Sequence, residues 1–137
     1  MYYEFEIEGR LPSLNEYINA CRKHYQQGAT FKRRLEERVC LDIYKARTLG
    51  YLPVKPVECP VRAHFTFCEK NYKRDIDNVS ALARKVILDA LVQTGVLIDD
   101  SPKYVVGLVD NFCIGKDEKI IVQLEEQNPQ KALTDNK

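Results

Sequence analysis

The chain has 137 residues, of which 45% are hydrophobic and 30% are charged, and its formal net charge is +1 at pH 7. This length suits one domain, and the apolar content is enough for a core, which excludes a disordered chain. No apolar run reaches the roughly 20 residues of a membrane span, and the start of the sequence lacks the apolar stretch of a signal peptide. We therefore expect a soluble, cytoplasmic protein with no membrane partner.

The number and spacing of the cysteines argue against a zinc site and against a disulfide framework. They are odd in number, and no two of them form a C-x-x-C pair: Cys21, Cys40, Cys59, Cys68 and Cys113. This spacing is unlike that of a zinc site or a disulfide framework. We expect reduced thiols, either buried or free.

The first half of the chain predicts a strand, a short helical turn, a long helix and a second strand. Alternation in YEFEIE predicts a half-exposed strand over residues 3–8. Ser13 is a candidate cap for a short turn through Ile18, and the polar segment RKHYQQG is expected to be a loop ending at Gly28. Apolar residues spaced three and four apart predict a helix over about 31–48, and CPVRAHFTF predicts the next strand.

The second half predicts one helix and two strands. The helix spans about residues 78–94, and the segment GVLIDDSP follows it as a loop. The strands KYVVGLVD and KIIVQLE are joined by a hairpin turn in FCIGKDE. We expect a single domain over residues 1–126 and a polar, mobile tail over 127–137. The order β-α-β-α-β-β predicts an α+β fold with helices packed on a mixed four-stranded sheet.

Charge is unevenly distributed along the chain. Residues 9–74 contain 14 Lys or Arg and 6 Asp or Glu, a net charge of +8, whereas residues 75–137 contain 7 and 11, a net charge of −4. A basic half beside an acidic half suits a protein that binds a polyanion on one surface and a cation among its acids. The other interpretation is that the two halves neutralise each other in the fold.

Four aspartates flank the predicted helix over 78–94: Asp75 and Asp77 precede it, and Asp99 and Asp100 follow it. In an extended segment residues i and i+2 project to the same side, so Asp75 and Asp77 would repel each other unless a cation lies between them. Carboxylates without neighbouring His or Cys are the ligands of Mg²⁺ or Mn²⁺, and such sites serve phosphodiester cleavage. Alternatively, one of the first pair caps the helix and IDDSP is an ordinary turn.

Four motifs occur in a fixed order along the chain. They are LPSLNEY, KRDIDN, KVILDAL and TGVLIDD. This ordered set resembles the RusA family of Holliday-junction endonucleases, found in bacteria and their phages. The resemblance covers roughly residues 3–125.

The resemblance implies a RusA-like fold and the activity of a crossover junction endodeoxyribonuclease. Such an enzyme resolves four-way DNA junctions in recombination and repair by paired, Mg²⁺-dependent cleavage, with Mn²⁺ as a substitute. The resemblance implies that Asp75, Asp77 and Asp100 bind the metal and that Lys85 is needed for cleavage. It also implies a homodimer in a bacterial or phage-infected cell, because two symmetric cuts need two sites. The alternatives are a non-cleaving junction-binding protein of the same fold and a Mg²⁺-dependent hydrolase of small nucleotides.

Lys85 lies about one helical turn further from the D-x-D-N motif than the family's lysine does. Arg84 and Lys85 are adjacent on a helix, so their side chains point about 100° apart and only one can face the acids. The pattern before LDAL selects Lys85, whose side chain we expect to extend toward the helix N-terminus. The alternatives are that Arg84 takes this role, or that Lys85 forms only an ion pair with Asp89.

Basic side chains that precede the acids are candidate phosphate contacts. They are Arg22, Lys23, Lys32, Arg33, Arg34, Lys73 and Arg74. Any one of them is more often a plain surface charge. Their clustering favours binding to DNA.

Overall fold

The computed structural model describes residues 1–23 and 25–127, which form four strands and three helices. In chain order these are β1 (Tyr2–Glu8), α1 (Leu14–Lys23), α2 (Tyr25–Thr48), β2 (Val61–Glu69), α3 (Ile76–Gln93), β3 (Val105–Ile114) and β4 (Lys119–Glu126). The sheet order is β1-β4-β2-β3, in which β2 and β3 are parallel and the other two pairs are antiparallel. The prediction of an α+β fold with a mixed four-stranded sheet is confirmed.

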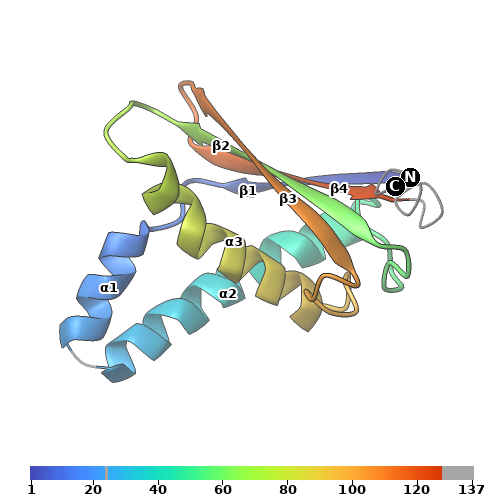
Figure 1. Cartoon of the computed structure of the whole chain (residues 1–137), viewed down its shortest axis with the longest axis horizontal. Coiled ribbons are helices and arrows are strands. Elements are labelled where there is room, and N and C mark those ends of the chain that lie inside the picture. Colours follow the sequence, from blue (N-terminus) through green and yellow to red (C-terminus); the bar gives the residue numbers. More distant parts are fainter. Residues whose placement is uncertain (24, 128–137) are drawn as a thin grey trace, which may run out of the picture.

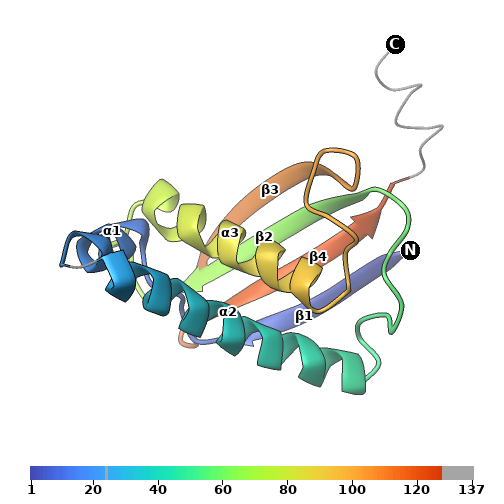
Figure 2. The ribbon, with the colours of Figure 1, turned by 90° about the horizontal axis from the view of Figure 1, so that it is seen from below.

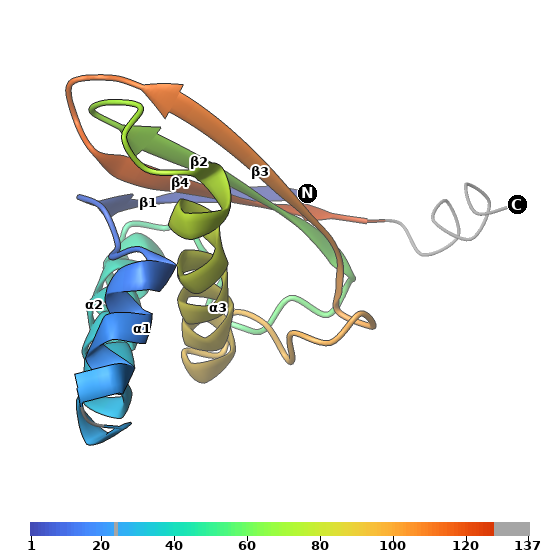
Figure 3. The same ribbon diagram turned by 60° about the vertical axis from the view of Figure 1, so that its left-hand side comes forward.

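All three helices lie on one face of the sheet, as Figures 1 and 3 show from two directions. Phe65 and Phe67 of the central strand β2 point into this layer and are fully buried, as the alternation of the sequence predicts. The apolar stripes of α2 and α3 meet them, and Val39, Ile43 and Val86 are 0% exposed. Burying a side chain of this size stabilises the fold by about 1.5–3 kcal/mol.

Helix α3 connects the two parallel strands, so it crosses the sheet face from the end of β2 back to the start of β3. The N-terminus of α3 therefore lies at the end of the sheet where β2 and β3 finish. The loop over residues 94–104 lies at the opposite end, where β3 begins (Figures 1 and 2). This connection determines where each predicted acidic residue is placed.

The predicted loop RKHYQQG is wrong, because α1 continues to Lys23 and α2 begins at Tyr25 instead of residue 31. Gly28 is buried inside α2, where an added Cβ would overlap the sulfur of Cys21. A glycine destabilises a helix by about 1 kcal/mol relative to alanine. Here it allows α1 to approach α2 closely, and the gain in packing offsets that cost.

Strand β3 is longer than predicted. Phe112, Cys113 and Ile114 belong to the strand and not to the hairpin turn, because β3 stays in register with β2 as far as Glu69↔Ile114. The amide of Gly115 donates to the carbonyl of Glu69 at 2.9 Å, directly after this last pair. Helix α3 likewise begins two residues before its predicted start.

The helices and the residue after β4 bear on two further predictions, the absence of a membrane span and the start of the tail. Within residues 1–23 and 25–127, no helix is both long and apolar enough to cross a membrane. The amide of Gln127 donates to the carbonyl of Pro60 at 2.7 Å, so the chain is still held at this residue. The rest of the predicted tail, residues 128–137, lies outside the described residues.

Candidate acidic site

Asp75 and Asp77 lie where β2 and β3 end and α3 begins. Asp75 precedes the helix in an extended conformation, with φ −68° and ψ 147°, and Asp77 belongs to the first helical turn. The Asp75 side chain makes no capping hydrogen bond, so helix capping does not account for its carboxylate. Both side chains are exposed, and in the described part of the chain neither forms an ion pair. Their charges therefore remain available to an external cation.

Two hydrogen bonds join the motif before α1 to the motif before α3. The backbone amide of Asn15 donates to Oδ1 of Asn78 at 2.9 Å. Nη1 of Arg74 donates to the carbonyl of Leu11, also at 2.9 Å. Asn15 and Asn78 have no predicted role beyond their place in the motifs. An Asn directly after two acids at a helix start is nevertheless a candidate for such a bond.

A capping box fixes the start of α1 beside the start of α3. The amide of Glu16 donates to Oγ of Ser13 at 3.2 Å, and the Glu16 carboxylate reaches back to the Ser13 amide at 3.5 Å. Ser13 thus has the capping role that the sequence predicts. Two helix N-termini with partial positive charge lie side by side here, which favours a bound phosphate.

Arg74, a predicted phosphate contact, has a structural role. Its side chain is only 13% exposed, and its Nε lies 2.6 Å from Oε1 of Glu69. Because another nitrogen of the same guanidinium binds the Leu11 carbonyl, the side chain is fully engaged within the protein. Arg74 therefore anchors the loop that carries Asp75.

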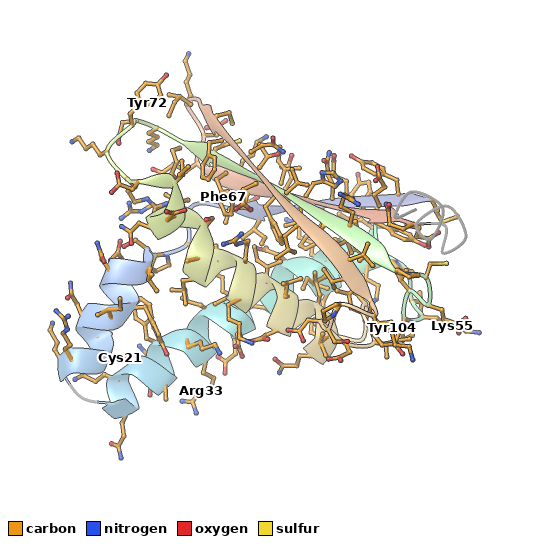
Figure 4. All side chains as sticks on the ribbon, in the orientation of Figure 1. Cys21, Arg33, Lys55, Phe67, Tyr72 and Tyr104 are labelled. Carbon is orange, nitrogen blue, oxygen red and sulfur yellow. The ribbon has the colours of Figure 1, made fainter. Side chains whose placement is uncertain are left out.

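Lys73 and Tyr72 are the exposed residues of this loop. Tyr72 is 88% exposed and stands at the outer end of the loop between β2 and α3 (Figure 4). Lys73 is also exposed, and it forms no ion pair with any described residue. Lys73 thus keeps its predicted availability for phosphate, and Tyr72 adds an aromatic ring that sequence reasoning had not singled out.

Asp100 and Lys85 lie away from Asp75 and Asp77. Nζ of Lys85 is 3.1 Å from Oδ1 of Asp89, which is the ion pair that the sequence left as an alternative. The hydrogen bond and charge of Asp89 raise the pKa of Lys85, and the charge of Asp100 adds to this effect, so Asp100 is close to this pair. The ammonium thus points along α3 away from Asp77, which is about 18 Å from Asp89 along the helix axis.

The three predicted metal ligands are therefore not assembled by one chain. Within residues 1–23 and 25–127, no three His, Cys, Asp or Glu side chains are grouped closely enough to hold one metal ion. The pair Asp75 and Asp77 still suits Mg²⁺, which commonly takes one or two carboxylates together with waters and substrate phosphates. The predicted third ligand, Asp100, does not fit this site from within the same chain.

Arg84 faces the sheet. Its Nη1 lies 3.1 Å from Oδ2 of Asp110 on β3. The other oxygen of Asp110, Oδ1, is buried and has no hydrogen-bond partner in the described structure. Arg84 therefore balances a largely buried carboxylate and does not point toward the acids at the helix start.

The other predicted phosphate contacts lie on α1 and α2. Arg22 and Lys23 are exposed at the end of α1. Lys32 is 3.4 Å from Oδ2 of Asp89 and 3.7 Å from Oε1 of Glu36, so its charge is already balanced. Of these three cations, Arg22 and Lys23 are open to a ligand and Lys32 is not.

Arg33 and Arg34, the last two predicted phosphate contacts, lie on α2. Arg33 is 4.0 Å from Oε1 of Glu37, is 70% exposed, and points away from the sheet (Figure 4). Arg34 is exposed and forms no ion pair within the described residues. Both remain available for a phosphate backbone.

Two surface hollows lie elsewhere on the molecule. One, of about 770 Å³, lies between β1 and the end of α2 and includes Tyr3 and Asp42. The other, of about 640 Å³, lies near the β3–β4 turn and includes Arg10 and Glu118. Neither is lined by the acids before α3, which are exposed at the surface instead of enclosed in a pocket for a small molecule.

Compared with known proteins, the chain matches no family model and has no significant match among curated protein sequences. The resemblance to the RusA family therefore stays a prediction from the motifs. Two of the four motifs, LPSLNEY and KRDIDN, are hydrogen-bonded to each other in the fold.

Proposed function

We propose that the protein is a Mg²⁺-dependent endonuclease of the RusA type that resolves four-way DNA junctions. The observation that carries the proposal is the pair Asp75 and Asp77, two exposed carboxylates without a protein cation. They lie beside two helix N-termini that the bond between Asn15 and Asn78 holds together. A hard cation and a phosphate are the ligands that this combination of charges favours.

The residues of this site would have separate roles in phosphodiester cleavage. Mg²⁺, when bound, supplies an activated water and neutralises charge on the scissile phosphate. Asp75 and Asp77 would hold it, and the starts of α1 and α3 would orient the phosphate. Lys73 would contact the DNA backbone, and the ring of Tyr72 offers a surface on which an unpaired base can stack.

An extended substrate accounts for the positions of the free cations. Helix α1 has 10 residues and is about 15 Å long, so Arg22 at its end is far from Asp77 at the start of α3. A ligand that contacts both must be longer than a nucleotide. This supports DNA over a small nucleotide as the substrate.

A homodimer accounts for the position of Asp100. Asp100 is close to Lys85, which lies about 12 Å from Asp77 along α3, so Asp100 is separated from Asp75 and Asp77 within one chain. A site with three aspartates then requires Asp100 of the partner subunit. A two-fold dimer provides this twice and so gives two sites for two symmetric cuts. We place this activity in the cytoplasm of a bacterial or phage-infected cell.

A nicking assay tests the proposal. The substrate is a synthetic four-way junction in Mg²⁺, with linear duplex and a nucleoside triphosphate as controls. We expect paired, symmetric nicks in the junction, little cutting of the duplex and no hydrolysis of the triphosphate. Junction binding without nicks would instead support the non-cleaving alternative, and triphosphate hydrolysis would show that the substrate class is wrong.

A further inference from the structure

Two cysteines meet on the face of the sheet that carries no helices. Cys68 of β2 and Cys113 of β3 are direct partners in the parallel register. Their sulfur atoms are 2.7 Å apart, compared with about 2.05 Å in a disulfide bond. Neighbouring strands are about 4.8 Å apart, which lies within the Cα separation that a disulfide spans. Register partners on neighbouring strands therefore lie close enough for a bond between their sulfur atoms.

The two thiols differ in accessibility. Cys113 is exposed, whereas Cys68 is 7% exposed. Burial raises the pKa of Cys68 to about 11, and the contact with Cys113 adds to the shift. Cys68 thus stays protonated at neutral pH, and Cys113 is the thiol that a dissolved oxidant reaches first.

The remaining cysteines are separate from this pair. Cys40 is buried and its sulfur contacts the Gln93 side chain at 4.0 Å, and Cys21 lies between α1 and α2 beside Gly28. Cys59 is exposed and serves as an internal reference for an unpaired thiol. Among the described residues, only Cys68 and Cys113 have sulfur atoms in contact.

We propose that Cys68 and Cys113 form an oxidation site at which a hydroperoxide generates a disulfide between β2 and β3. The Cys113 thiolate attacks one peroxide oxygen and breaks the O–O bond, which leaves a sulfenic acid and an alkoxide that takes up a proton. The Cys68 sulfur then attacks the sulfenic sulfur, so that the S–S bond forms and the S–O bond breaks. The departing hydroxyl leaves as water with the Cys68 proton. The two thiols together lose two electrons, and the peroxide gains them.

The disulfide lies next to the loop that carries the acidic site. Glu69 directly follows Cys68, and its carbonyl accepts a hydrogen bond from Gly115. Its carboxylate holds Arg74, the residue before Asp75. Linking the two strands here would restrain the end of β2 and so the start of this loop. This regulatory consequence rests on the proposed function, whereas the oxidation itself does not.

Peroxide titration of the full, reduced chain tests the proposal. Free thiols are alkylated after each addition, and peptides are mapped by mass spectrometry. We expect the alkylatable thiols to fall from five to three per chain, with a Cys68–Cys113 cross-linked peptide that dithiothreitol reverses. Cys68→Ser should instead leave a sulfenic acid at Cys113 that dimedone traps. Cys59→Ser, the matched control, should cross-link as the wild type does.

Two results would overturn the proposal. One is complete sulfenic acid formation at Cys113 of the wild type without a cross-link, and the other is a cross-link that joins Cys113 to Cys59 or to a second chain. Nicking of junction DNA by the reduced and oxidised forms is measured in parallel. Equal nicking with the disulfide present would refute the regulatory consequence alone. Absence of nicking in both forms would refute the proposed function and leave the oxidation site supported by the cross-link.

Discussion

The backbone amide of Asn15 donates to the side-chain oxygen of Asn78 across 2.9 Å and so ties the first turn of α1 to the first turn of α3. Asn78 directly follows Asp77, and the bond therefore holds the helix end that presents the two acids. Asn15 belongs to a motif more than sixty residues earlier in the chain. The relationship gives a physical reason for the two motifs to occur together.

Asn78→Ala removes the acceptor and leaves the Asn15 amide without its partner. We expect the free energy of unfolding to fall by about 1 kcal/mol, as for loss of a typical hydrogen bond. Urea denaturation measures the change. Asn78→Asp keeps an acceptor oxygen and should recover most of the loss, and Asn19→Ala on the exposed face of α1 is the control. Equal stabilities of the Asn78→Ala and Asn19→Ala variants would show that the bond contributes little.

Asp77→Asn retains the shape of the side chain and removes its negative charge. We expect junction cleavage in Mg²⁺ to fall by about a hundredfold or more, because charge stabilisation at the metal and phosphate is weakened. Binding in Ca²⁺ should be unchanged or tighter, since one repulsion toward phosphate is lost. Single-turnover cleavage and a binding titration measure the two effects. Glu58→Gln, an exposed acid in the connection between α2 and β2, is the control. Wild-type cleavage by Asp77→Asn would refute the metal-site assignment.

Mixing Asp77→Asn with Asp100→Asn tests whether two chains share each site. Each variant alone should be inactive. In a mixed dimer, one site combines an intact Asp77 with an intact Asp100 of the partner subunit, so unfolding and refolding the mixture should restore about a quarter of the wild-type sites. The restored activity should give single nicks instead of paired ones. If all three aspartates belong to one chain, mixing restores nothing.

Lys85→Ala and Arg84→Ala separate catalysis from stability. Because Lys85 is close to Asp100, the proposed dimer would bring both to the Asp75 and Asp77 of the partner subunit. We therefore expect Lys85→Ala to slow cleavage by on the order of a hundredfold, the loss typical of a charge that stabilises a transition state, with junction affinity little changed. Its exposed ion pair with Asp89 contributes at most a few tenths of a kcal/mol to stability. Arg84→Ala leaves Asp110 unpaired and should lower the free energy of unfolding by about 1–2 kcal/mol. Normal cleavage by Lys85→Ala with slow cleavage by a stably folded Arg84→Ala would transfer the catalytic role to Arg84.

Because the pKa of Cys68 is raised in the folded chain, we expect the free energy of unfolding to fall at alkaline pH. Its pKa is raised to about 11 in the folded chain, compared with about 8.5 for a free cysteine. Between these values the unfolded chain has lost the proton that the folded chain retains, so stability falls as pH rises from about 8.5 to 11. Denaturant unfolding of the reduced protein at several pH values measures this. Cys68→Ala should show a smaller decrease, and Cys59→Ala the same decrease as the wild type.

Much of the fold could be predicted because it depends on local periodicity. Alternation identified the buried face of β2 with Phe65, and three- and four-residue spacing identified the stripes of α2 and α3 with Ile43 and Val86. Gly28 was misread because its small size serves a contact with another helix, which no local pattern records. Local chemistry describes a residue well only where its neighbours in space are also its neighbours in sequence.

The sequence predicts the part of the candidate site that is local in the chain, and not the part that depends on distant residues. Asp75 and Asp77 lie two residues apart, so their proximity follows from the sequence itself. The place of Asp100 depends on the direction in which the chain leaves α3, and the engagement of Arg74 depends on a carbonyl at Leu11 that is distant in sequence. Neither could be deduced before the elements were arranged in space.

The strand that is synthesised after the other three lies inside the sheet. β4 pairs with both β1 and β2, so Tyr2 meets Glu125 only after nearly the whole described chain has been made. On the ribosome, β1 has no hydrogen-bonding partner until β4 emerges, and Phe5 and Ile7 remain without their final packing during that time. The helices and the β2-α3-β3 unit can form earlier, because their contacts are closer in sequence. A nascent chain stalled before Lys119 would therefore expose the apolar side of β1, which makes it a substrate for chaperones.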